Sequence, residues 1–154
     1  MAEPRWLTDV EMRAWQGLLN TWALLNRRLD QQSREDAGLS HLQYEVLARL
    51  SASPGGRMRM TELADVLIHS KSGLTYQVTQ LEKAGLVRRE PLAGDERAVV
   101  AVLTDAGRTR MAQVAPGHVA AVRELFVDVL TPEQVAAFAD GFDRVLRRLR
   151  SPDR

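Results

Sequence analysis

Hydrogen-bonding side chains recur on one side of a predicted helix that begins after Ser70. Leu74, Val78 and Leu81 follow one another at spacings of four and three, so they form the apolar face of this helix. The other positions carry polar or cationic side chains: Lys71, Ser72, Thr75, Tyr76, Thr79, Gln80 and Lys83. Such groups bind base edges in the DNA major groove and backbone phosphates. We therefore expect the lysines to contact phosphates and the uncharged residues, with Ser70 at the N-cap, to contact bases or backbone.

A hairpin after this helix carries a second candidate for the same chemistry. Strands are expected at 86–90 and 98–103, with a long tip between them that includes Asp95, Glu96 and Arg97. Arg97 is the only cation between Glu90 and Arg108. A guanidinium at a hairpin tip suits insertion into a narrow minor groove, where the negative potential is concentrated. The alternative is a solvated charge pair.

Two further arginines, Arg88 and Arg89, lie at consecutive positions of the first predicted strand. Side chains alternate between the two faces of a strand, so at most one of them can contact DNA by the same route. Arg88 is the candidate that we include in the predicted DNA-binding set.

Local signals predict the elements that position these residues. A shorter helix is expected from Thr61, with Thr61 as its cap, and a turn at Ile68–His69 joins it to the helix described above. Gly85 is expected to end that second helix. Residues 57–60 read as a short edge strand that pairs with the hairpin. The order is therefore helix, turn, helix and β-hairpin.

The runs TELADVL, SKSGLTYQVTQLEKAGLVRRE and GDERAVVAVLTDAGR resemble the MarR-type winged helix-turn-helix transcriptional regulators. With LSHLQYEVL before them, the resemblance covers residues 39–110 closely. It implies a homodimer that binds palindromic promoter DNA, often released by a small anionic or phenolic ligand. It also implies that Asp95 pairs with Arg97 and holds it in position.

The flanking segments 8–37 and 105–150 are predicted to be long helices that form a dimerisation region around a winged unit at 39–104. Apolar residues recur at spacings of three and four at both ends of the chain, where the members are Trp15, Leu18, Trp22, Leu25 and Leu29, and Val135, Phe138, Phe142, Val145 and Leu149. One small unit cannot cover this much apolar surface. The expected fold is mainly α, with a small β-wing.

Composition limits the other classes of function. The chain has 154 residues and a net charge of +1, so it lacks the basic excess of an unspecific polyanion binder. The absence of cysteine excludes disulfides and thiol redox sensing. The sequence shows neither a signal peptide nor a membrane span, so we expect a cytoplasmic protein without a membrane partner. The near-neutral charge also keeps open an alternative function, a winged-helix module for protein contacts that does not bind DNA.

Other candidate sites carry weaker signals. Trp15, Trp22 and Tyr44 can line a pocket for an aromatic ligand, although dimer core is the preferred interpretation of the tryptophans. His41 and Glu45 share a helix face, but two potential ligands at that spacing do not define a metal site, and none is predicted. No phosphate loop, zincin motif or nucleophile with a base is recognisable, so no cofactor and no enzymatic activity are predicted.

Overall fold

The computed structural model describes residues 4–151, apart from the side chain of Glu96. The chain divides into two compact units, the first ending at His118 and the second beginning at Val119. The elements, in chain order, are α1 (Asp9–Ala37), α2 (His41–Ala52), the 3₁₀ turn η1 (Pro54–Gly56), β1 (Arg57–Arg59), α3 (Met60–Leu67), α4 (Lys71–Lys83), β2 (Val87–Leu92), β3 (Asp95–Leu103), α5 (Asp105–Val122), the π-helical turn η2 (Arg123–Val127) and α6 (Pro132–Arg150). The fold is mainly α with one small sheet, as predicted.

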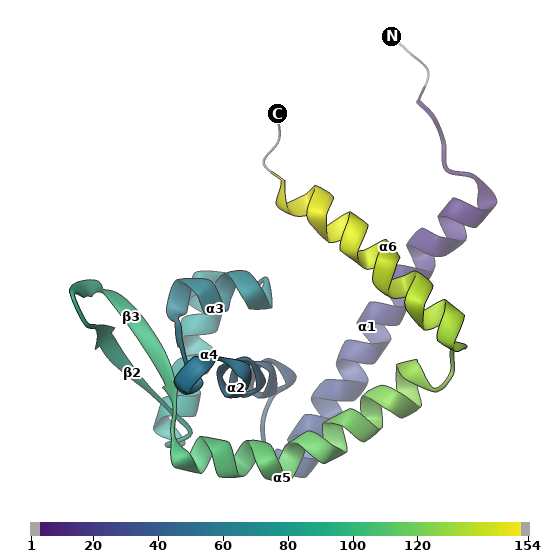
Figure 1. The fold of residues 1–154 in the computed structure, drawn as a ribbon. Coiled ribbons are helices and arrows are strands. Elements are labelled where there is room, and N and C mark those ends of the chain that lie inside the picture. The colour runs from purple at the N-terminus through teal and green to yellow at the C-terminus, as the bar shows by residue number, and fades with distance from the viewer. Residues whose placement is uncertain (1–3, 152–154) are drawn as a thin grey trace. The chain divides into compact units, whose positions relative to one another are not determined.

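The core of the first unit lies where α2, α3 and α4 meet the sheet. Leu47, Leu63 and Leu74 come from the three helices and are fully buried there. Val87 and Leu103 reach the same core from β2 and β3. Figure 1 shows the β2–β3 hairpin projecting beyond these helices. This arrangement is a helix-turn-helix, formed by α3 and α4, with an adjoining wing.

The sheet has three antiparallel strands in the order β1-β3-β2, so the predicted edge strand does pair with the hairpin. The predicted hairpin bounds were wrong at the tip. β2 continues to Leu92 and β3 begins at Asp95, which leaves Ala93 and Gly94 as the turn. The register shifts between Pro91 and Leu92, so the pairing is irregular next to the tip, where one strand bulges.

Side-chain caps set several helix boundaries where the sequence predicts them. Thr8 and Thr131 form capping boxes at the starts of α1 and α6, and Ser40 does so for α2. Thr61 does not cap α3, which begins one residue earlier. The extended backbone of Arg59 at the end of β1 occupies the N-cap position, and its N–H donates to the carboxylate of Glu62 at 3.3 Å.

The second unit contains η2 and α6, and its rings pack on one another. The ring centroids of Phe126 and Phe138 are 5.8 Å apart, and those of Phe138 and Phe142 are 5.6 Å apart. No residue of α6 is buried. None of the helices in residues 4–151 combines the length and the apolar character needed to cross a bilayer.

Candidate nucleic-acid interface

The candidate recognition helix α4 buries one face and leaves the other accessible. Leu74, Val78 and Leu81 are buried in the core of the unit, as the spacing predicts. The remaining predicted contact residues are exposed or half-buried: Ser70, Lys71, Ser72, Thr75, Tyr76 and Lys83 are exposed, whereas Thr79 and Gln80 are half-buried. The phenol-bearing side chain of Tyr76 is 62% exposed, although a large aromatic residue would gain free energy by burial. The accessible face therefore consists of groups able to bind a polar partner.

Local hydrogen bonds orient several side chains of this face. The Ser70 hydroxyl accepts from the Gly73 N–H at 3.2 Å and caps α4, as predicted. The hydroxyls of Thr75 and Thr79 donate to the carbonyls of Lys71 and Thr75, at 2.7 and 2.8 Å. Because their protons are engaged inside the helix, these two threonines present acceptor lone pairs and methyl groups outward.

An ion pair joins α4 to the wing. Glu82 of α4 accepts from the Arg89 backbone N–H at 3.0 Å, from its Nε at 3.0 Å and from its Nη2 at 2.7 Å. Hydrogen bonds from the Arg89 guanidinium and backbone hold the pKa of the Glu82 carboxyl below its usual range. The pair connects the inner face of β2 to the C-terminal end of α4 and so constrains the position of the wing relative to α4.

A close approach at the start of α5 completes this attachment. The Thr104 hydroxyl donates to the Gly85 carbonyl at 2.7 Å, just after α4 ends. A Cβ on Gly107 would lie 2.2 Å from the Leu86 carbonyl oxygen, so only glycine fits against that backbone. Residues 104–107 therefore attach the start of α5 to residues 85–86, which follow α4, through a hydrogen bond and a close backbone contact.

The wing holds Arg97 through its backbone. Asp95 Oδ1 accepts from the Arg97 backbone N–H at 3.1 Å. The expected pairing of the Asp95 carboxylate with the Arg97 guanidinium does not occur in this structure, because the carboxylate closes a local turn in the irregular part of the hairpin. The Arg97 side chain is exposed, so its guanidinium is accessible while its backbone is constrained.

Arg88 and Arg89 face opposite sides of the sheet, as strand alternation predicts. Arg89 is engaged by Glu82 on the inner side. Arg88 is exposed on the outer side, with its Nε 3.4 Å from Glu90 Oε2. Arg88 is consequently the one of the two that is free to approach a phosphate.

The three residues proposed to line a ligand pocket lie in different surroundings. Trp15 and Trp22 are 52% and 62% exposed on α1, whereas Tyr44 is buried on α2. The Tyr44 ring stacks on His118 of α5 at a centroid distance of 4.0 Å. The structure therefore joins Tyr44 to His118, a partner that the sequence did not suggest.

His41 completes a stack of three rings at this junction. Its centroid lies 5.6 Å from that of His118. Burial lowers the pKa of both histidines below the ordinary value. The carboxylates of Glu45 and Asp30 partly oppose this shift at His41, and the neighbouring His41 reinforces it at His118. Both Nδ1 atoms are buried without a hydrogen-bond partner.

His41 does not belong to a metal site in the described part of the chain. Within residues 4–151, no group of three or more histidine, cysteine, aspartate or glutamate side chains is placed to hold an ion. His41 and Glu45 remain neighbours on one helix face without a third ligand.

Comparison with known proteins places this geometry among transcriptional regulators. A model of the MarR family matches residues 37–98. PecS of Dickeya dadantii, an HTH-type transcriptional regulator, is 31% identical over 125 residues, which cover 80% of this chain and 73% of PecS.

Two solved structures from Streptomyces coelicolor are similar over nearly the whole chain. AbsC, a MarR family transcriptional regulator, is 43% identical with a TM-score of 0.89, over 96% of this chain and 99% of AbsC. Sco3205, a MarR family transcriptional regulator solved in complex with DNA, is 42% identical with a TM-score of 0.92, over 98% of this chain and 94% of that chain. The similarity includes α4 and the wing as well as the flanking helices.

Proposed function

Because the chain belongs to the MarR family of transcriptional regulators, we propose that it binds double-stranded DNA as a homodimer through α4 and the wing. The observation that carries this proposal is the split character of α4: the side that holds Leu74 and Val78 is buried, and the side that holds Lys71 and Tyr76 is accessible. The structure of Sco3205, which was solved in complex with DNA, supports DNA as the partner. The protein is proposed to act in the cytoplasm and to have no enzymatic activity.

The DNA contact that we propose for each residue follows from the chemistry of its side chain. Lys71 and Lys83 bind phosphates, and Ser72, Thr75 and Tyr76 meet base edges or backbone in the major groove. Ser70, Thr79, Gln80 and Arg88 add backbone contacts at the edges of this surface. Arg97 enters the adjacent minor groove, with Asp95 fixing the backbone that carries it.

A second copy of the chain is the proposed partner of the terminal helices. Most of the stripe residues on α1 and α6 are apolar yet exposed, with Trp22 at 62% and Leu149 at 75%. Two chains related by a twofold axis place two recognition helices about one helical turn of DNA apart, roughly 10 base pairs, which matches a palindromic site. Occupation of a promoter by such a dimer blocks access of other proteins, so repression is the proposed outcome.

A small aromatic anion is the proposed effector, with Trp15, Trp22 and Tyr44 as candidate contacts. Support comes from the ring stack at Tyr44, where the Nδ1 atoms of His41 and His118 are buried without hydrogen-bond partners. A ligand that weakens DNA binding must itself bind more weakly in the presence of DNA. A panel of phenolic acids in which none changes either DNA affinity or melting temperature would remove the effector from this proposal.

The proposed function is tested by a mobility shift on the DNA upstream of the gene, repeated at several salt concentrations. Phosphate contacts predict that log K falls linearly with log salt. The absence of a complex with upstream DNA, and with a random-sequence duplex library, would favour the alternative of a protein-interaction module.

A further inference from the structure

The outer face of the sheet, turned away from α4, carries a ladder of arginines. Arg57 of β1 and Arg88 of β2 both pair with Val102 of β3. Two residues along the strands, Arg59 and Glu90 both pair with Val100. Residues opposite one another in antiparallel strands project to the same face. Met58, Val87, Ala101 and Leu103 occupy the alternate positions and belong to the core or pack against it, so the arginines lie on the opposite side.

Two buried valines confirm how these side chains lie. Val100 and Val102 are buried but are not part of the core on the inner face. The side chains that the ladder places beside them are Arg57, Arg59 and Arg88. Arginine stems cover apolar surface while their guanidinium groups stay in water. The arginines therefore lie along the sheet with their charged ends outward.

Glu90 holds the guanidinium groups of Arg57 and Arg88 in place but engages only some of their N–H donors. Its Oε1 lies 2.8 Å from Arg57 Nη2, and its Oε2 lies 3.4 Å from Arg88 Nε. Each guanidinium has five N–H donors, so both keep donors available for a further acceptor. Because these side chains are already ordered, a ligand that binds them loses less side-chain entropy.

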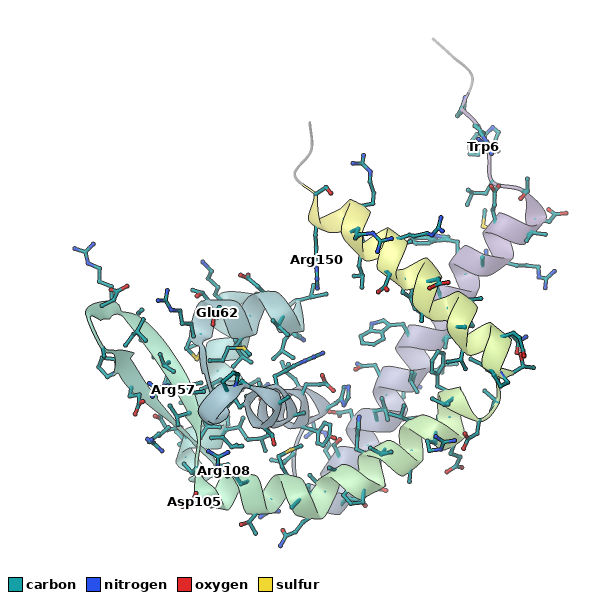
Figure 2. All side chains as sticks on the ribbon, viewed as in Figure 1. Trp6, Arg57, Glu62, Asp105, Arg108 and Arg150 are labelled. Atoms are coloured by element: carbon teal, nitrogen blue, oxygen red, sulfur yellow. The ribbon has the colours of Figure 1, made fainter. Side chains whose placement is uncertain are left out.

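Arg108 extends the same charged region from the start of α5. Its Nη2 donates to the Gly55 carbonyl at 3.4 Å, and a Cβ on Gly56 would lie 2.7 Å from that nitrogen. Gly56 directly precedes β1, so Arg108 lies next to the beginning of the arginine ladder (Figure 2). We call Arg57, Arg59, Arg88 and Arg108 the arginine face. Glu90 and Asp105 form ion pairs with it, and the Glu62 carboxylate accepts from the Arg59 backbone N–H, so four arginines face three carboxylates and an excess of one positive charge remains.

We propose that the arginine face binds the phosphate backbone of the DNA that flanks the site read by α4 and the wing, with Arg57 and Arg59 as phosphate ligands. This inference rests on the proposed function and enlarges the surface assigned to it. The face offers arginines, which bind phosphates through two parallel hydrogen bonds, and the wing that carries Arg97 is built from the same strands.

Distance along the sheet supports DNA as the occupant. Val100 lies three positions after Arg97 and Val102 lies five positions after it, so the arginines paired with these valines lie roughly 10–17 Å from Arg97 along the strand, at about 3.3 Å per residue. One turn of duplex is about 34 Å long. A duplex that continues past the wing therefore passes within reach of this face.

The test compares two duplexes built on the tightest site selected from a random-sequence library. The core duplex ends at the edge of the minor groove that the wing protects, and the extended duplex adds roughly 10 base pairs, one helical turn, on each side. Binding of the full chain and of the double variant Arg57→Gln/Arg59→Gln is measured by fluorescence anisotropy in a salt series. The expected result is tighter binding of the extended duplex by the parent and loss of that gain in the variant. Two phosphate contacts per protomer predict a salt slope shallower by about four units for the dimer.

A matched control removes the same charge elsewhere. Arg13 and Arg27 are exposed on the side of α1 opposite the tryptophans, so Arg13→Gln/Arg27→Gln should keep the gain from extension. The inference is overturned if the parent binds both duplexes equally, if Arg57→Gln/Arg59→Gln keeps the gain, or if the control loses it equally. These outcomes leave the proposed function intact, whereas a parent that binds neither duplex contradicts the proposed function itself.

Discussion

The winged unit and the terminal helices use apolar residues in opposite ways. Leu47, Leu63 and Leu74 are completely buried within the winged unit, and its polar residues are left on the surface. On α1 and α6 most of the stripe residues are exposed, although Leu29 at the end of the α1 stripe is buried, and Phe142 remains 38% exposed even within its own cluster of rings. The core of the winged unit is completed by Met111 and Val114 of α5, whereas the apolar stripes of α1 and α6 stay largely exposed, and we propose that a partner covers them.

This difference explains why two kinds of partner are proposed. An accessible polar face gains little from a hydrophobic partner and suits phosphates and base edges. Exposed apolar stripes of this length mark protein contacts, and a second copy of the chain carries the complementary stripes. Substitutions in each region should consequently change different measurements.

The largest expected effect is that of a charge in the apolar stripe of α6. Phe142→Glu introduces a carboxylate that has no partner in the proposed dimer interface, at a cost of about 3–5 kcal/mol per protomer. Light scattering at micromolar concentration should then show a monomer in place of a dimer, and DNA affinity should fall with it. Glu124→Gln, a change at an exposed polar position of the same unit, should leave the dimer intact. A parent protein that is itself a folded monomer of 17.2 kDa would contradict the proposal that the terminal helices form a dimer interface.

A cavity in the winged unit should have the next largest effect, on stability rather than assembly. Leu74→Ala removes a fully buried side chain, and we expect a loss of about 2–5 kcal/mol in the free energy of unfolding. Leu24→Ala provides the matched control, because Leu24 is 59% exposed on α1. Urea denaturation measures both variants. Equal losses in the free energy of unfolding would contradict the difference in burial between the winged unit and α1.

Removal of the wing cation should affect DNA binding alone. Arg97→Ala is expected to keep the fold and the dimer but to weaken binding by about 1–3 kcal/mol per site, because the wing tip loses its cation. Asp95→Ala should cause a smaller loss, since Asp95 orders the backbone at Arg97 and leaves the guanidinium in place.

Lys83→Ala on the recognition helix serves as the comparison for the wing variants. Anisotropy titrations of a labelled operator measure all of them under one salt condition. Parent-like affinity of Arg97→Ala, together with a clear loss in Lys83→Ala, would show that the wing has a structural role only.

The smallest expected effect concerns pH. Burial lowers the pKa of His41 and His118, so the unfolded chain binds more protons than the folded chain between the lowered values and the ordinary histidine pKa. Stability from this source is therefore complete above about pH 6.5 and is lost as the pH falls through that window. Melting temperatures at pH 7.5 and 5.5 should differ less in His41→Gln/His118→Gln than in the parent. An identical pH dependence of both proteins would exclude the histidine stack as the cause.

Local signals predicted much of the fold, because caps and apolar spacing act within a few residues. Ser40, Ser70 and Thr131 cap the helices that follow them, and Leu74 and Val78 occupy the buried face of α4. The strand ends at the wing tip were mispredicted, because the bulge near Pro91 depends on how two strands pair.

Contacts between distant elements could not be read from the sequence in the same way. Arg89 meets Glu82, and Tyr44 meets His118, only because the tertiary fold brings α4 to β2 and α2 to α5. The sequence did indicate that Arg88 and Arg89 point to opposite sides, since strand alternation is a local property. It did not indicate that Arg57 would join Arg88 across Glu90.

We propose that the polar face of the winged unit binds DNA while the apolar terminal helices join two chains. The mass of the complex with the selected operator duplex, measured by native mass spectrometry, tests both parts together. We expect two protein chains per duplex for the parent and no such complex for Phe142→Glu at the same concentration. A complex with one chain per duplex, or one that Phe142→Glu forms as readily as the parent, would contradict this proposal.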